Sequence, residues 1–286
     1  MEMVLTVFGF LAGAILGSLA LSLAERSLQE KSSFWGRSYC PKCKHKLHWY
    51  DLIPIFSYLI LRGQCRYCRS AIGIEYLLVE MIMGILIAFL FSQTALFDLP
   101  FKIFFITVLA VLFLTDLKEM LIPDRIILPA IIISLIYLVI FTLFKIGYLY
   151  YYLSQSEIGK LLLPPKSDYF ERHAIITAEP LIWGILLGLL IAGFFYALIL
   201  ITKGKGMGGG DVKLGAFIGI VLGFPQGLLA IVLSFLLGAV FSVVLLLTGK
   251  KHFGQVIPFG PFLVTGSLVT LFWGKEILDW YINLGT

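Results

Sequence analysis

Residues 203–213 have the sequence Lys-Gly-Lys-Gly-Met-Gly-Gly-Gly-Asp-Val-Lys and separate two long apolar runs. They contain five glycines and a single carboxylate, Asp211, which lies at the start of the second run. A chain that borders lipid rarely leaves its backbone this loose unless the segment lines a cavity or a water-facing site. An acidic residue at such a border is a candidate functional residue. The stretch therefore predicts a helical membrane protein in which Asp211 works with a partner group.

The composition supports a membrane protein. Of the 286 residues 59% are hydrophobic and 14% are charged, with a mean hydropathy of +0.97, whereas soluble domains carry about 25% charged residues. The apolar runs are continuous rather than alternating, which favours helices over the strands of a membrane barrel. The fold class is therefore an all-α polytopic membrane protein with about eight transmembrane helices, at residues 3–24, 76–97, 99–115, 122–144, 180–202, 212–224, 226–248 and 257–274.

Lysine and arginine predict the orientation of these spans. The loops on one side of the eight spans hold 16 of the 22 Lys and Arg residues, at residues 25–74, 116–125, 203–213 and 249–256. The positive-inside rule places these loops in the cytoplasm. The predicted organisation is a first transmembrane helix at 1–24, a cytoplasmic domain at 25–74 and a seven-helix membrane domain at 75–286. In that domain, residues 145–178 are expected to form a long extracytoplasmic loop rich in tyrosine.

All four cysteines lie in the cytoplasmic domain, as Cys40-x2-Cys43 and Cys65-x2-Cys68 with 21 residues between the pairs. Two such pairs are typical of a zinc site. Four thiolates fill a tetrahedral shell and leave no position for water, so the zinc is expected to be structural. Two disulfides are the alternative, which a cytoplasmic location disfavours because thiols there stay reduced.

The same domain is basic, which raises the question of a nucleic-acid partner. A short cytoplasmic loop of a membrane protein is basic for reasons of topology and lies near anionic lipid. No aromatic stacking platform for bases is evident in the sequence. We therefore expect contact with membrane lipid and no nucleic acid.

A second acidic stretch is predicted on the same side of the membrane as Asp211. Asp116 ends the third span, and Pro123 and Asp124 open the fourth. Two neighbouring carboxylates cannot both ionise easily, so a pair formed by Asp116 and Asp211 could act as general acid and general base on a water molecule. A single Asp at a helix start more often caps the helix, and Asp124 fits that role best. Gly208, Gly209 and Gly210 would let an extended substrate chain approach the backbone closely.

Two other classes of function remain open from the residues alone. Broken glycine-rich segments and membrane acids also occur in ion-coupled transporters. Against a transporter, both aspartates are predicted at one face rather than at the midplane. The other alternative is a zinc-stabilised membrane scaffold without catalysis.

Three segments of the chain resemble the type IV prepilin peptidases, a family of membrane aspartyl proteases of the Gly-x-Gly-Asp type that includes the prepilin leader peptidase/N-methyltransferases. The segments are Gly-Gly-Gly-Asp-Val-Lys-Leu at 208–214, Asp116 through Pro123-Asp124, and Ile-Pro-Phe-Gly-Pro-Phe at 257–262. The resemblance implies that Asp116 and Asp211 are catalytic. It also implies that prepilins and pseudopilins, the substrates of type IV pilus and secretion systems, are cut after a glycine at the cytoplasmic face of the bacterial inner membrane.

Many members of that family also methylate the new N-terminus with S-adenosylmethionine. The chain departs from the family pattern at Leu21, where the family usually has Asn, and at Ile74-Glu75-Tyr76-Leu77, where the family usually has Arg before Tyr-Pro. Both departures lie in the N-terminal half and bear on methyl transfer more than on proteolysis. The resemblance therefore predicts a peptidase and leaves methyl transfer open.

Overall fold

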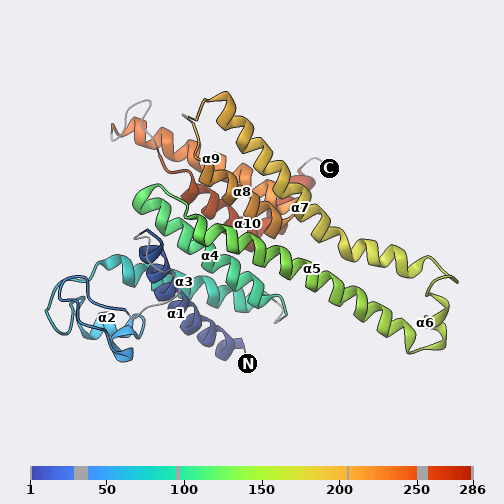
Figure 1. Cartoon of the computed structure of the whole chain (residues 1–286), viewed down its shortest axis with the longest axis horizontal. Helices are drawn as coiled ribbons and strands as arrows, with labels where there is room; N and C mark the ends of the chain where they lie inside the picture. The colour runs from blue at the N-terminus through green and yellow to red at the C-terminus, as the bar shows by residue number, and fades with distance from the viewer. Residues whose placement is uncertain (1, 29–37, 95–96, 205, 250–256, 285–286) are drawn as a thin grey trace. The chain divides into compact units, whose positions relative to one another are not determined.

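The computed structural model of the chain describes residues 2–28, 38–94, 97–204, 206–249 and 257–284 (Figure 1). Parts of three expected cytoplasmic segments, residues 29–37, 205 and 250–256, lie outside this range, as do residues 95–96 of the predicted span 76–97. The described residues form helices with no named strand: α1 (Glu2–Leu28), η1 (Trp49–Leu52), α2 (Phe56–Ile60), α3 (Ile74–Gln93), α4 (Leu99–Glu119), α5 (Asp124–Ser154), α6 (Glu157–Leu161), α7 (Tyr169–Ile201), α8 (Gly209–Leu222), α9 (Gln226–Leu247) and α10 (Gly260–Asn283).

Each of the eight predicted spans corresponds to one helix, namely α1, α3, α4, α5, α7, α8, α9 and α10. Among the described residues, six helices are long and apolar enough to cross a membrane, namely α1, α3, α4, α5, α7 and α9. Helix α8 has 14 residues, which is about 21 Å and shorter than a hydrocarbon core of about 30 Å. The prediction of an all-helical, multi-pass membrane protein is confirmed.

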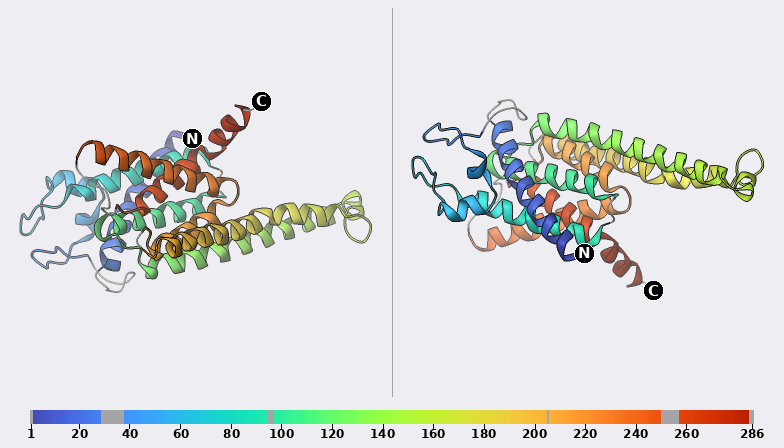
Figure 2. Two further views of the ribbon diagram at one scale, coloured as in Figure 1. Left: turned by 90° about the horizontal axis from the view of Figure 1, so that it is seen from above. Right: turned by 90° about the horizontal axis from the view of Figure 1, so that it is seen from below.

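The structure differs from the sequence prediction at residues 145–178, which were expected to form a loop. Helix α5 continues to Ser154, α6 follows at Glu157–Leu161, and α7 begins at Tyr169. The aromatic and apolar residues of this segment continue the flanking helices as far as Ser154 and from Tyr169 onward, and Pro164 and Pro165, which lack a backbone donor, lie in the connection between α6 and α7. The extended helices form the hairpin seen in Figure 2, so most of the predicted loop is helix.

The chain forms two compact units, Met1–Ile126 and Ile127–Thr286, and each is described by itself. The boundary lies three residues into α5 rather than at residue 75. Helices α3 and α4 belong with α1 because both pack against it. The first unit thus combines the cysteine domain with three membrane helices.

Glycines allow α1 and α3 to approach closely. Gly9, Gly13 and Gly17 recur every fourth residue of α1 and face α3. A Cβ atom on Gly13 would lie 2.4 Å from the carbonyl oxygen of Met83, and one on Gly17 would lie 3.0 Å from the Cα of Glu80. Small residues at such spacing are typical of membrane helices that associate through backbone contact.

The second unit repeats this arrangement between α7 and α8. A Cβ on Gly184 would lie 2.6 Å from the carbonyl oxygen of Ile220, and one on Gly219 would lie 2.8 Å from the Cα of Gly188. Gly215 faces the ring of Phe195 near the end of α7, with 2.7 Å to a Cβ placed there. Because Asp211 lies one helical turn before Gly215, this packing places Asp211 close to the level where α7 ends.

We predict that Gly13→Ala destabilises the protein, because the added methyl group meets a backbone carbonyl that cannot rotate away. Overpacking of this kind costs about 1–3 kcal/mol, so the thermal unfolding midpoint in detergent, followed by circular dichroism, should fall. Gly193→Ala is the matched control, since a Cβ there would meet nothing within 4 Å. Equal midpoints for the two variants would show that α1 and α3 do not pack this closely.

Candidate active site and metal centre

The structure brings the four predicted cysteines together. The sulfur atoms of Cys40, Cys43, Cys65 and Cys68 all lie within 4.8 Å of one another. The distance from Cys40 Sγ to Cys68 Sγ is 3.8 Å, and a tetrahedral site with Zn–S bonds of about 2.3 Å requires sulfurs about 3.8 Å apart. No disulfide joins these four thiols. The cluster therefore fits a tetrahedral metal ion bound by four thiolates.

The two cysteine pairs adopt the same local structure. The N–H of Cys40 donates to His45 O at 3.0 Å and the N–H of Cys65 donates to Ser70 O at 2.8 Å. The residue after each second cysteine, Lys44 or Arg69, has a positive φ of 58° or 54°. Each pair is thus a tight turn that presents two sulfurs on one side.

Hydrogen bonds favour the thiolate form at two of the cysteines. The backbone N–H of Cys43 lowers the pKa of the Cys40 thiol to about 6 against the opposing effect of burial. The Ser70 hydroxyl, 3.2 Å from Cys68 Sγ, lowers the pKa of Cys68. At Cys43 the backbone N–H of His45 also favours the thiolate, but burial and the neighbouring thiols outweigh it and raise the pKa to about 11. A cation at the centre would relieve this mutual repulsion.

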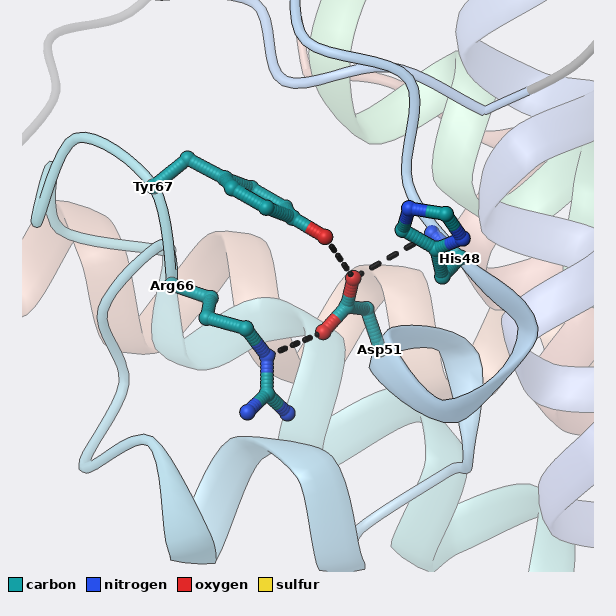
Figure 3. A network of polar contacts seen from close by, with 4 residues as sticks. All are labelled: His48, Asp51, Arg66 and Tyr67. Carbon is teal, nitrogen blue, oxygen red and sulfur yellow. Dashed lines mark hydrogen bonds and ion pairs between the residues drawn. The ribbon is translucent and has the colours of Figure 1, made fainter.

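An ion-pair network joins the second cysteine turn to the segment between the two turns (Figure 3). Arg66 Nε lies 2.7 Å from Asp51 Oδ1, and the Tyr67 hydroxyl and the His48 backbone N–H donate to Asp51 Oδ2 at 3.1 and 3.2 Å. Burial opposes ionisation of Asp51, but these three donors outweigh it and hold the pKa of the carboxyl below its usual value. The network fixes residues 48–52 against the second cysteine turn.

The first candidate catalytic carboxylate, Asp116, is buried near the end of α4 with 5% of its surface exposed. Its backbone carbonyl accepts the N–H of Met120 at 2.9 Å, where the helix ends in a left-handed residue. Glu119 and Asp124, the other acids nearby, are exposed. Burial therefore distinguishes Asp116 from Asp124, which is the first residue of α5 and fits the helix-start role expected for it.

The second carboxylate, Asp211, lies in the first turn of α8 and is partly exposed. Its Oδ2 accepts the backbone N–H of Gly208 at 3.3 Å, so the side chain caps the helix. The structure places Gly208 at the N-cap and Gly209 and Gly210 inside the first turn, rather than in a separate loop. Asp116 and Asp211 belong to different units of the chain.

Four polar side chains to which the sequence analysis gave no structural role link parts of the first unit. Glu25 of α1 accepts a hydrogen bond from the Tyr76 hydroxyl of α3 at 2.5 Å and pairs with Lys118 of α4 at 3.3 Å. Glu80 of α3 is buried, and its Oε2 accepts the backbone N–H of Ile55 at 2.7 Å. Glu80 lies inside the predicted span 76–97, where acids are rare and usually have a role, whereas Glu25 follows the first predicted span and carried no such signal.

Comparison with known proteins assigns both halves of the chain to one family. Residues 11–94, which contain all four cysteines, match the bacterial peptidase A24 N-terminal domain. Residues 170–243, which contain Gly208–Gly210 and Asp211, match the type IV leader peptidase family. Asp116 lies between the two matched segments. No solved structure matches the chain.

Relatives named prepilin leader peptidase/N-methyltransferase align with most of the chain. The protein from Bacillus subtilis strain 168 is 30% identical over 279 residues, which cover 96% of this chain and 97% of that protein. The protein from Aeromonas salmonicida strain A449 is 31% identical over 248 residues, 86% of this chain and 75% of that protein. The Pseudomonas aeruginosa protein is 30% identical over 250 residues, 86% and 74% respectively. None of these relatives is named as a transporter. The chain belongs to the type IV leader peptidase family.

Proposed function

We propose that this protein is a membrane aspartyl endopeptidase that removes the leader peptide from prepilins and pseudopilins, cutting after a glycine on the cytoplasmic side of the bacterial inner membrane. The observation that carries the proposal is Asp211 at the glycine-rich start of α8, within the segment that matches the leader peptidase family. Asp116 supports it as a buried carboxylate at a helix end. The related proteins named as prepilin leader peptidases support the substrate class.

In the proposed mechanism Asp116 and Asp211 share one proton. The ionised carboxylate takes a proton from a water molecule while the protonated one donates to the scissile carbonyl oxygen, so that hydroxide adds to the carbonyl carbon. The tetrahedral intermediate then collapses, the C–N bond breaks, and the leaving amine receives a proton. No metal takes part, and no covalent bond to the enzyme forms.

The glycines before Asp211 suit a substrate-facing role. A Cβ on Gly209 would meet nothing within 4 Å, unlike the glycines between α7 and α8. Packing inside the chain therefore does not require glycine at this position. An extended substrate chain could use the free space and approach the backbone near Asp211.

The cysteine cluster is proposed to hold zinc in a structural role, with Cys40, Cys43, Cys65 and Cys68 as the four ligands. The distance between sulfurs and the lowered thiol pKa values support this choice.

Methyl transfer from S-adenosylmethionine is a second candidate activity, which the names of the relatives favour. We propose a cytoplasmic orientation for both the cluster and the carboxylates because 16 of the 22 Lys and Arg residues belong to the same set of loops.

We predict that Asp116→Asn and Asp211→Asn each abolish cleavage of a prepilin substrate, since neither amide can act as acid or base. The loss should exceed about a hundredfold, the lower end of the effect of general acid–base catalysis. Asp124→Asn is the matched control and should retain activity, because Asp124 is exposed at the start of α5. Purified variants with unchanged circular dichroism would be assayed for cleavage. Full activity in either of the first two variants would overturn the mechanism.

We predict that purified wild-type protein contains about one zinc ion per chain and that Cys40→Ala lowers this to near zero, because three thiolates hold the ion poorly. His45→Ala should keep the zinc, since the described metal cluster consists of cysteines alone. Metal content measured by mass spectrometry checks both variants. A zinc content unaffected by Cys40→Ala would rule out the four-cysteine site.

A further inference from the structure

The cysteine domain contains an apolar segment that its metal site does not explain. Residues 52–61 have the sequence Leu-Ile-Pro-Ile-Phe-Ser-Tyr-Leu-Ile-Leu and carry no charge. Several of the largest side chains of this region face outward, with Trp49 77%, Ile60 73%, and Phe56 and Leu59 each 58% exposed. Within α2 the exposed residues Phe56, Leu59 and Ile60 have the spacing of one helical face. We call this surface the apolar face, formed by Trp49, Leu52, Ile53, Phe56, Leu59 and Ile60.

The segment that carries the apolar face is attached to α3 and to the residues just before it. The Ile55 N–H donates to the buried Glu80 carboxylate at 2.7 Å, and the Tyr58 hydroxyl donates to Ile72 O at 3.4 Å. Ile55 has a φ of 64° and a ψ of −55°, and Phe56 N–H bonds to Pro54 O at 2.6 Å, which together define a γ-turn. This turn is strained and rare, and such strain persists only where the surroundings fix it. The position of the face beside α3 is therefore determined by the fold.

The contact with Glu80 also sets the depth of the apolar face. Helix α3 has 20 residues, about 30 Å in length, which just matches the hydrocarbon core of a bilayer. Its first residue, Ile74, thus lies near the edge of the core. Glu80 is six residues further on, about 9 Å along the axis, and its side chain leans back toward the helix start. Ile55 and α2 then lie at the level of the headgroups and upper acyl chains.

The charges of the domain complement an anionic surface. Residues 38–73 carry six Lys and Arg residues and one acid, Asp51, which is paired with Arg66. Arg62 comes directly after the C-cap of α2 and is exposed. Apolar side chains flanked by basic residues are typical of segments that lie in the interface of a membrane with anionic lipid.

We propose that the apolar face is embedded in the phospholipid interface of the membrane that α1 and α3 cross. The cysteine domain is then seated on the bilayer rather than suspended in water. Trp49 and Phe56 act as interfacial anchors, and the Ile55–Glu80 hydrogen bond sets their depth. This inference does not depend on the proposed peptidase activity.

The test uses the full-length protein reconstituted in vesicles of phosphatidylcholine and phosphatidylglycerol that carry bromine at defined depths of the acyl chain. The fluorescence of Trp49 is obtained as the difference between wild type and Trp49→Phe. We expect bromine near the glycerol end of the chain to reduce the Trp49 signal at least about twofold, and bromine near the methyl end to reduce it less, as for an interfacial residue. Iodide in the aqueous phase should have little effect.

Ile60→Glu introduces a charge into the apolar face and should remove most of the quenching by lipid. Gln64→Glu adds the same charge four residues later at an exposed position outside the face and should leave the quenching unchanged. Zinc content shows whether the cysteine domain of each variant is folded. The quenching of Trp49 in the wild-type protein tests by itself whether the apolar face lies in the phospholipid interface. Quenching of Trp49 by iodide and not by lipid would place the face in water. Quenching by neither would mean that protein covers it, and either result overturns the proposal.

Discussion

Close contact between helix backbones, which glycine permits, is the constraint on which both units depend. Lipid provides no hydrophobic drive for helices to associate, so they must gain contact by fitting together. In the first unit Gly13 lies against the carbonyl of Met83, and in the second Gly219 lies against Gly188. A side chain at either position would separate the pair of helices. The first contact joins α1 to α3 in the unit that also contains α4 with Asp116, and the second supports α8, whose first turn contains Asp211.

The polar residues of the first unit show how the ends of these helices are organised. Glu25 joins α1 to α3 and α4 through Tyr76 and Lys118, at the same end of α4 as Asp116. Glu80 ties the cysteine domain to α3. A metal site, a membrane helix and a buried carboxylate therefore share one compact unit. A structural metal would stiffen this unit, because four thiolates close the long loop between α1 and α3.

Sequence reasoning succeeded where a short pattern defines the structure. The spacing of the cysteines was sufficient to predict their cluster, and the apolar runs were sufficient to predict the helices. It failed at residues 145–178, because aromatic residues suit both an interfacial loop and a helix. The partners Tyr76 and Lys118 of Glu25 are 51 and 93 residues away in sequence, a separation that no local pattern spans. Asp116 and Asp124 flank one short loop in the sequence, where the family resemblance favours Asp116, and the structure adds that Asp116 is buried and Asp124 exposed.

The most direct test of paired carboxylates is whether positions 116 and 211 meet in the membrane. The double variant Asp116→Cys with Asp211→Cys would be treated with a short bis-maleimide, which alkylates one thiol at each end. Asp124→Cys with Asp211→Cys is the matched pair, and zinc content confirms that the native cysteines stay metal-bound. If the two carboxylates share a proton and a water molecule, the first pair should cross-link within one chain at least about tenfold faster than the second, because effective concentration falls steeply with separation. Equal rates, or no cross-link in the first pair, would contradict a shared catalytic site.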